Sequence, residues 1–291
     1  MSLNSTFEHY VRYRFGNHTE FEVPNRYINL DIKEMGCKGV ICSAFDIVTK
    51  KQVAIKKRSR ALDGIFPSKV LFRDIKLLRT VKHKNVINLI HAFTPHCSLK
   101  EFQDVYLVTE LMDVNLCQLL RRKLDLKRMS YLMYQLLCGV KYLHSIGLIL
   151  RDLKPSNVAV SSDCSLKILS FGLLRSVKTA FVRTPFAVTR NYRAPEVIFG
   201  MEFKENVDVW SVGCIMGELL RGSVIFSGGD HVEIWDSIVQ QLGTPSETFM
   251  AKIEPDVRSY IESQAKHVGR PFEEIFPDEG FSVQQHWMCL P

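Results

Sequence analysis

The sequence has no C-x-x-C pair, no apolar run long enough for a membrane helix, and no signal peptide at its start. Its eight cysteines are scattered, and their spacing excludes the common zinc and thioredoxin-type motifs. A bilayer helix needs about 18 consecutive, mainly apolar residues. We therefore expect a chain without membrane association in a reducing compartment, either the cytoplasm or the nucleus.

Internal repeats and low-complexity tracts are also absent, and neither sign of charge dominates. The 291 residues are 46% hydrophobic and 24% charged, with a net charge of +7. This composition supplies a real core and excludes a disordered chain. The densest basic groups, residues 50–60 and 121–123, suit either a solvated surface or a patch for acidic peptide or phosphate. No nucleic-acid partner is expected.

The first part of the chain has a β-type pattern. Residues 1–20 are interpreted as an N-terminal arm, and residues 21–112 as a small lobe. Two apolar-rich runs, 39–47 and 51–57, are joined by a short polar segment, which predicts a hairpin. Residues 66–81 then follow a helical period, which places four apolar side chains on one face: Val70, Leu71, Ile75 and Leu78.

The remainder, residues 113–291, is dominated by helical periodicity. One predicted helix carries an apolar stripe made of Met129, Leu132, Met133, Leu136, Val140 and Leu143. A second, over residues 207–222, is apolar almost all round and should be buried. Cys138 and Cys214 lie in such apolar runs and are expected in the core. A β-rich part followed by an α-rich part predicts a two-lobed α+β enzyme with a cleft.

The segment "RDLKPSN" at residues 151–157 carries the clearest chemistry. Asp152 supplies a carboxylate base, Lys154 a cation for a γ-phosphate, and Asn157 an amide oxygen for a metal ion. "VAIKK" places Lys56 on a strand, where a lysine clamps the α- and β-phosphates of a nucleotide. "YRAPE" and "DVWSVG" follow downstream in order, which makes a chance match implausible.

With these motifs in place, the chain resembles the protein kinases, specifically the MAP kinases of the c-Jun N-terminal kinase group. Six segments match in order, at residues 102–118, 128–145, 152–157, 166–169, 188–198 and 204–218. The resemblance spans about residues 21–280. It implies a bilobal fold, ATP and Mg²⁺ as cofactors, and protein substrates with Ser or Thr before proline. Upstream MAP kinase kinases and docking peptides are the implied partners, in stress signalling.

The same resemblance implies roles for individual residues. The ATP site would comprise Gly36, Gly39, Ala54, Lys56, Asp74, Thr109, Glu110 and Met112, with Thr109 as gatekeeper where relatives carry methionine. In the activation segment, Thr184 and Phe186 stand at the T-P-Y motif, and Arg151 would receive a phosphate on Thr184. A docking groove is implied near Arg128 and Cys164.

The phosphate-handling parts depart from the family pattern. Glu34 replaces the first loop glycine and either points to solvent or crowds the triphosphate. Asp74 replaces a glutamate expected to pair with Lys56 and is shorter by about 1.5 Å. Leu150 replaces a histidine. Most seriously, Ser170 replaces the aspartate that holds Mg²⁺, so any metal ligation there is weak.

The match also ends early, after residues 276–281, whereas the family continues with two more helices. From this we expect a C-terminally incomplete large lobe, an unpaired Glu196, and partly uncovered apolar faces on the helices near residues 129–143 and 207–220. Two main functions remain open: a catalytically impaired MAP-kinase-like Ser/Thr kinase, or a pseudokinase that only docks pathway partners. A marginally stable product with little independent role is a third.

Overall fold

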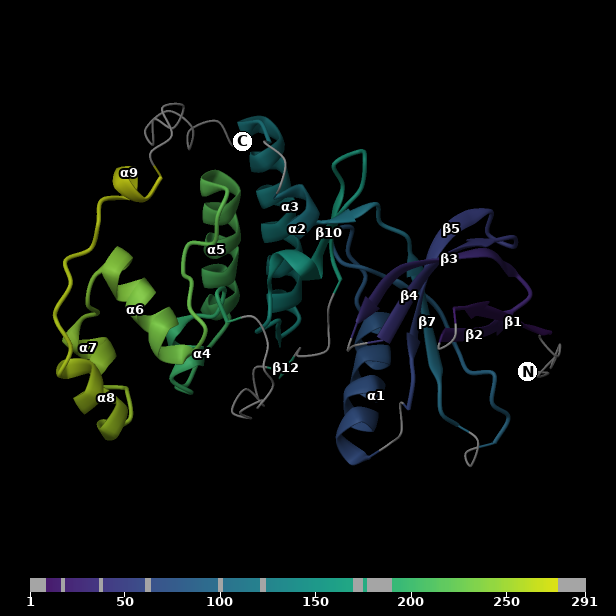
Figure 1. Cartoon of the computed structure of the whole chain (residues 1–291), viewed down its shortest axis with the longest axis horizontal. Coiled ribbons are helices and arrows are strands. Elements are labelled where there is room, and N and C mark those ends of the chain that lie inside the picture. Colours follow the sequence, from purple (N-terminus) through teal and green to yellow (C-terminus); the bar gives the residue numbers. More distant parts are fainter. Residues whose placement is uncertain are drawn as a thin grey trace. The chain divides into compact units, whose positions relative to one another are not determined.

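The computed structural model describes residues 9–16, 19–36, 39–60, 64–98, 102–120, 124–169, 175–176 and 190–276, without the side chains of 65–67, 70 and 175–176. The chain divides into two compact units, coloured along the sequence in Figure 1. The first unit is Met1–Val114 with Ala159–Gly172, and the second is Asn115–Val158 with Leu173–Pro291. The return of Ala159–Gly172 to the first unit is a feature that the linear division at residue 112 did not anticipate.

A five-stranded antiparallel sheet forms the body of the first unit. Its order is β3–β4–β5–β7–β6, and the strands are β3 (Tyr27–Gly36), β4 (Gly39–Asp46), β5 (Lys51–Arg58), β7 (Val105–Glu110) and β6 (Leu89–Phe93). The predicted hairpin is β4–β5, in continuous register from Val40↔Lys57 to Asp46↔Lys51. Alternation along β5 buries Val53 and Ile55 completely.

A second hairpin, β1 (Tyr10–Phe15) and β2 (Thr19–Pro24), packs on this sheet. It occupies part of the segment interpreted as an N-terminal arm. Phe21 is fully buried and meets Tyr106 edge to face, with ring centroids 5.7 Å apart. Within the described part of the arm, Tyr10, Tyr13 and Phe15 are partly buried and pack against the same core cluster.

Helix α1 (Ile65–Thr80) lies alongside the sheet (Figure 1) and contacts β6. Leu71 and Leu78 are buried and Ile75 is half-buried, so three of the four residues predicted for one face point inward. The side chain of the fourth, Val70, lies outside the described part.

The second unit is mainly helical. Its longer helices are α3 (Leu126–Ser145), α5 (Asn206–Arg221), α6 (His231–Leu242) and α8 (Pro255–Glu262), and its shorter ones are α2 (Leu116–Leu119), α4 (Pro195–Ile198), α7 (Glu247–Met250), α9 (Phe272–Ile275) and the 3₁₀ turn η1 (Pro155–Asn157). Short strands complete the chain: β9 (Leu148–Ile149) with β12 (Arg175–Ser176), and the sheet β11 (Leu166–Ile168), β10 (Val158–Val160) and β8 (Val114–Asn115). A sheet-rich unit and a helical unit confirm the α+β bilobal fold.

Burial on α3 differs from expectation. The whole predicted stripe from Met129 to Leu143 is buried, so its expected partial exposure is wrong. The neighbouring face is exposed instead, through Tyr131, Tyr134 and Leu137. On α5 the expectation holds in part, because Val209 is exposed and Trp210, Met216, Leu219 and Leu220 are half-buried. The buried apolar residues of this helix are Val207, Val212, Cys214 and Ile215.

Among the cysteines, Cys214 is buried as predicted, but Cys138 is only half-buried because it borders the exposed face of α3. Among the described residues, no helix combines the length and the apolar character needed to cross a membrane.

Candidate active site

The second unit brings the three predicted catalytic residues together. The loop after β9 places the carboxylate of Asp152 3.8 Å from Lys154 Nζ, and both side chains are largely buried. Asn157 donates its Nδ2–H to the carbonyl oxygen of Asp152 at 2.7 Å. The turn η1 makes this possible, since the N–H of Asn157 bonds back to the carbonyl of Lys154 at 2.9 Å. The spacing Asp-x-Lys-x-x-Asn is thus closed into one compact polar group.

Asp208, in the first turn of α5, anchors the backbone at the start of this loop. It is completely buried and accepts 2.8 Å hydrogen bonds from the backbone N–H groups of Leu150 and Arg151. His144 Nε2 lies 2.8 Å from the same carboxylate. Buried charges are tolerated when several donors satisfy them, as here. Sequence reasoning quoted the "DVWSVG" motif but assigned no role to this aspartate.

Arg151 has a strained backbone, with a φ of +65° that non-glycine residues rarely adopt. Its guanidinium lies over the Phe203 ring, 5.2 Å from the centroid. The loop conformation is therefore fixed by contacts on both sides of Arg151: the Asp208 carboxylate at its backbone and Phe203 at its side chain.

A second arginine reaches the same region. Burial lowers the pKa of Arg193, and Arg190 lowers it further, while the nearby carboxylate of Asp152 acts in the opposite direction. The segment carrying Arg193 is anchored to α5, because Tyr192 donates its hydroxyl to Glu218 at 2.6 Å and its carbonyl accepts from Ser211 Oγ at 2.7 Å. Asp152 thus lies within the field of a cation from a separate segment of the unit.

In the first unit, the two loop glycines face each other at the β3–β4 turn, with Gly36 paired to Gly39. Gly39 has a φ of +114°, and a Cβ placed on it would lie 2.1 Å from the carbonyl oxygen of Lys57. Gly36 has open space around it. The side chain of Glu34 is exposed, in agreement with the solvent-facing alternative.

Lys56 lies on β5 opposite Leu107 of β7, and its side chain is half-buried. Asp74 on α1 is buried, and its carboxylate lies 3.3 Å from the guanidinium of Arg58. Since Arg58 is two residues from Lys56, both cations project from the same face of β5. The predicted Lys56–Asp74 pair stays a prediction, and Arg58 is a further cation for this acid that sequence reasoning missed.

The segment expected to contact adenine follows along β7. Thr109 pairs with Ala54 across the sheet, and its hydroxyl donates to the carbonyl of Glu110 at 3.3 Å. The Glu110 carboxylate forms a 2.9 Å ion pair with Lys167, and Ser161 Oγ lies 3.5 Å from the sulfur of Met112. Lys167 and Ser161 therefore hold the end of β7 and the residues that follow it, within the first unit. The sequence pattern did not suggest these contacts.

Several predicted residues cannot be placed in this way. Ser170, Thr184 and Phe186 lie outside the described residues. Arg128 is exposed at the start of α3, 3.5 Å from Asp125, and belongs to the second unit, whereas the half-buried Cys164 belongs to the first. The docking groove expected near them stays a prediction.

The prediction made for Glu196 was wrong. It was expected to be buried and unpaired, but its carboxylate is half-buried and accepts a 2.7 Å hydrogen bond from Asn206 Nδ2. The donor comes from the start of α5, ten residues downstream, and satisfies the acid locally.

The donor atoms of the site suit a magnesium ion only in part. Because Asn157 uses its Nδ2–H toward Asp152, its Oδ1 is left as a hard oxygen ligand of the kind Mg²⁺ prefers. Across the described ranges, no three side chains of His, Cys, Asp and Glu gather as a metal-binding group. Among the described residues of the second unit, Asn157 is thus the one whose side-chain oxygen would hold the ion.

Comparisons with known proteins agree with this geometry. Residues 35–272 match the protein kinase domain family. The stress-activated protein kinase JNK of Drosophila melanogaster is 55% identical over 260 residues, which are 89% of this chain and 70% of that protein. The stress-activated protein kinase jnk-1 of Caenorhabditis elegans is 52% identical over 276 residues, which are 95% of this chain and 59% of that protein. The chain belongs to the protein kinase family and is a JNK-like MAP kinase.

Proposed function

We propose that this chain is a JNK-like Ser/Thr protein kinase of stress signalling whose phosphoryl transfer is strongly impaired. The observation that carries the kinase part is the catalytic loop, in which Asp152, Lys154 and Asn157 are gathered. Asp208 fixes the backbone of Leu150 and Arg151 immediately before them. The relatives are named stress-activated protein kinases. The impairment is inferred from Ser170, which stands where the family carries an acidic ligand.

Each loop residue has a defined task in this proposal. Asp152 accepts the proton of the substrate hydroxyl, which requires its carboxylate to be ionised and directed by its neighbours. Lys154, 3.8 Å away, lies close enough to balance charge on the transferred phosphoryl group. Asn157 orients the Asp152 backbone through its Nδ2–H and offers Oδ1 to a metal ion.

The first unit would bind the nucleotide. Gly36, which has open space around it, would let the β3–β4 turn approach phosphates closely. Lys56 would neutralise the α- and β-phosphates, and the backbone at Glu110 and Met112 would meet adenine. Mg²⁺, when bound, neutralises phosphate charge, and a serine hydroxyl is a poor ligand for it compared with a carboxylate. Weak metal binding would cost about 10²–10⁴ in rate.

The test measures ATP affinity by thermal shift, with and without Mg²⁺, and phosphorylation of a peptide containing Ser-Pro. Ser170→Asp should make ATP binding depend on Mg²⁺ by more than tenfold and should raise the phosphorylation rate. Asp152→Asn, placed in both backgrounds, is the isosteric control and should abolish transfer. A rise above tenfold in the unsubstituted chain would contradict the proposed impairment.

The alternative is a pseudokinase that docks MAP kinase partners without catalysis. Ser170, together with Asp74 and Glu34, favours it because three phosphate-handling positions are altered in one chain. If neither the unsubstituted chain nor Ser170→Asp phosphorylates the peptide above the level of Asp152→Asn, the kinase proposal fails and the docking function is the better account.

A further inference from the structure

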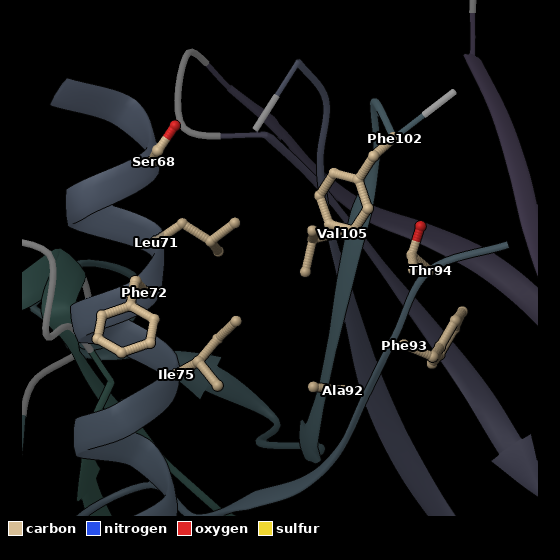
Figure 2. A pocket seen from close by; sticks show the side chains of 9 residues that line it. All are labelled: Ser68, Leu71, Phe72, Ile75, Ala92, Phe93, Thr94, Phe102 and Val105. Atoms are coloured by element: carbon tan, nitrogen blue, oxygen red, sulfur yellow. The ribbon is translucent and has the colours of Figure 1, made fainter. Parts of the chain in front are cut away.

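Helix α3 has an apolar stripe that is exposed in the described structure. Tyr131, Tyr134 and Leu137 have 51%, 50% and 45% of their surface exposed. They follow one another at intervals of three residues and so share one side of the helix, which we call the α3 face. The α3 face belongs to the second unit, whereas the apolar pocket beside α1 that Figure 2 shows belongs to the first. An exposed apolar stripe of this kind marks a contact surface.

The charged side chains that flank the α3 face are basic. Lys127 lies four residues before Tyr131, Lys141 lies four residues after Leu137, and both are exposed. Helix α3 itself contains no aspartate or glutamate. A segment that combines large apolar side chains with carboxylates is therefore complementary to this face.

The chain continues after α9 with residues 277–291, which lie outside the described residues. The described structure fixes where this segment starts, because a Cβ placed on Gly217 of α5 would lie 3.1 Å from Cζ of Phe276. Helix α5 in turn contacts α3. An extended chain spans roughly 3.5 Å per residue, so the ten residues after Phe276 span up to about 35 Å, well beyond the width of one helix. The segment can therefore reach the α3 face from α5.

The composition of residues 277–291 matches the α3 face. Large apolar side chains are concentrated in the run "WMCL" at residues 287–290. Asp278 and Glu279 supply carboxylates, and the segment contains no lysine or arginine. Tryptophan and methionine are among the residues enriched at contact surfaces.

We propose that residues 277–291 fold back onto the α3 face of the same chain. Trp287 and Met288 cover Tyr134 and Leu137, while the two carboxylates balance the flanking lysines. Burial of these large side chains offsets the entropy lost on ordering the segment. Because the segment is tethered to α5, its effective concentration at the face is high, so contacts of modest strength are enough. In this position the segment excludes other proteins from the α3 face.

Two native cysteines can report this contact. Cys289 lies in the segment, and the half-buried Cys138 lies beside the α3 face, four residues after Tyr134. A short bismaleimide, added to a dilute solution of the full chain, should link Cys138 to Cys289, as read by peptide mass spectrometry of the monomer fraction. Cys97 and Cys117 are exposed and serve as internal references. The Cys138–Cys289 link should exceed the links of Cys289 to either reference by at least about fivefold.

Substitutions on both sides of the contact should weaken the link. Trp287→Ala and Tyr134→Ser should each lower its yield by about tenfold, and the two together should lower it little further, because both remove the same contact. Tyr260→Ser on α8 is the matched control, since this tyrosine is 47% exposed, and it should change nothing. The labelling rate of Cys138 with a monofunctional maleimide normalises each yield, and circular dichroism checks each fold. Trp287→Ala leaves α3 unaltered, so it still tests the contact if Tyr134→Ser disturbs the helix.

Three results would overturn the proposal. The first is linkage of Cys289 to Cys97 or Cys117 as often as to Cys138. The second is a yield that neither Trp287→Ala nor Tyr134→Ser lowers. The third concerns an equal mixture of isotope-labelled and unlabelled chains: links that join a labelled to an unlabelled chain would assign the α3 face to a second copy.

Discussion

The buried carboxylate of Asp208 accepts a 2.8 Å hydrogen bond from the backbone N–H of Arg151, the residue with the positive φ of +65°. A residue in this conformation costs of order 1–3 kcal/mol and persists when its surroundings hold it. The position of Asp152, one residue later, therefore depends on a side chain 57 residues downstream.

Asp208→Asn should destabilise the chain by about 3 kcal/mol, because the amide keeps one acceptor but turns its Nδ2–H toward existing donors. Urea unfolding measures this loss. Asp256→Asn, at an exposed position in the first turn of α8, is the matched control and should stay within about 0.5 kcal/mol. A change below 1 kcal/mol for Asp208→Asn would show that Arg151 is held by other contacts.

Stability in acid should depend on Asp46. Burial alone would raise its pKa, but hydrogen bonds from Arg26, Thr49 and Val48 together lower the pKa to about 2 from its ordinary 3.8. The Asp46 carboxylate therefore contributes about 2 kcal/mol to the free energy of unfolding above pH 3.8, and this contribution is lost as the pH falls toward 2.

Urea unfolding from pH 6 to pH 2 tests this contribution. The difference in free energy of unfolding between the unsubstituted chain and Asp46→Asn should decrease from pH 6 to pH 2. Thr49→Val removes one hydrogen bond, so its free energy of unfolding should differ less from that of the unsubstituted chain. A difference that stays constant with pH would refute the assignment.

Thiol reactivity should follow exposure. Cys117 is exposed, whereas burial raises the pKa of Cys42 and of Cys214 to about 12, so these two remain thiols at neutral pH. An acrylamide reagent at pH 7.5 should label Cys117 well before Cys42 or Cys214, as read by peptide mass spectrometry. Under the proposed nucleotide site, an ATP-site ligand should protect Cys117.

Cys117→Ser serves as the control for labelling at this position. Faster labelling of the half-buried Cys138 than of the exposed Cys117 would contradict the burial described for these two side chains.

Glu196→Gln should change stability by less than about 0.5 kcal/mol, because glutamine keeps the acceptor that Asn206 uses. Asn206→Ala removes the donor and should cost about 1 kcal/mol. Thermal unfolding of both variants checks the pair. Strong destabilisation by Glu196→Gln would mean that the charge itself, and not only the hydrogen bond, is required.

Under the proposed nucleotide site, Thr109→Met should reduce the affinity of bulky ATP-site inhibitors by at least about tenfold, because the longer methionine side chain would occupy room that threonine leaves for them. The exposed Thr80→Met is the control and should leave inhibitor binding unchanged. Equal affinity for the unsubstituted chain and Thr109→Met would remove Thr109 from the gatekeeper role.

Local patterns predicted the elements of this fold well. The alternation in residues 39–57 corresponds to β4–β5, and the helical period around Leu71 and Leu78 corresponds to α1. These signals depend on neighbours within a few residues. That Asp152, Lys154 and Asn157 lie together was also predictable, because the three predicted catalytic residues fall within six positions.

Long-range partners were not predictable from one sequence. Asp208 accepts a hydrogen bond from Arg151, which is 57 residues away in the sequence. Asp74 lies beside Arg58, and no spacing in the sequence indicates this pair. The prediction that the apolar stripe of α3 is partly exposed was wrong for a related reason. Its period identifies an apolar stripe, but Tyr131 and Tyr134 show that a neighbouring face can be apolar and exposed, and only tertiary packing decides which face is covered.

Missense substitutions at the two glycines of the β3–β4 turn, Gly36 and Gly39, should have different effects on the protein. Any side chain at Gly39 collides with the carbonyl of Lys57, so a missense change there should lower the amount of folded protein. The same change at Gly36 meets open space and should leave protein abundance intact, so that any phenotype from it reports on ligand handling alone. Variants three residues apart in one turn would thus belong to different mechanistic classes.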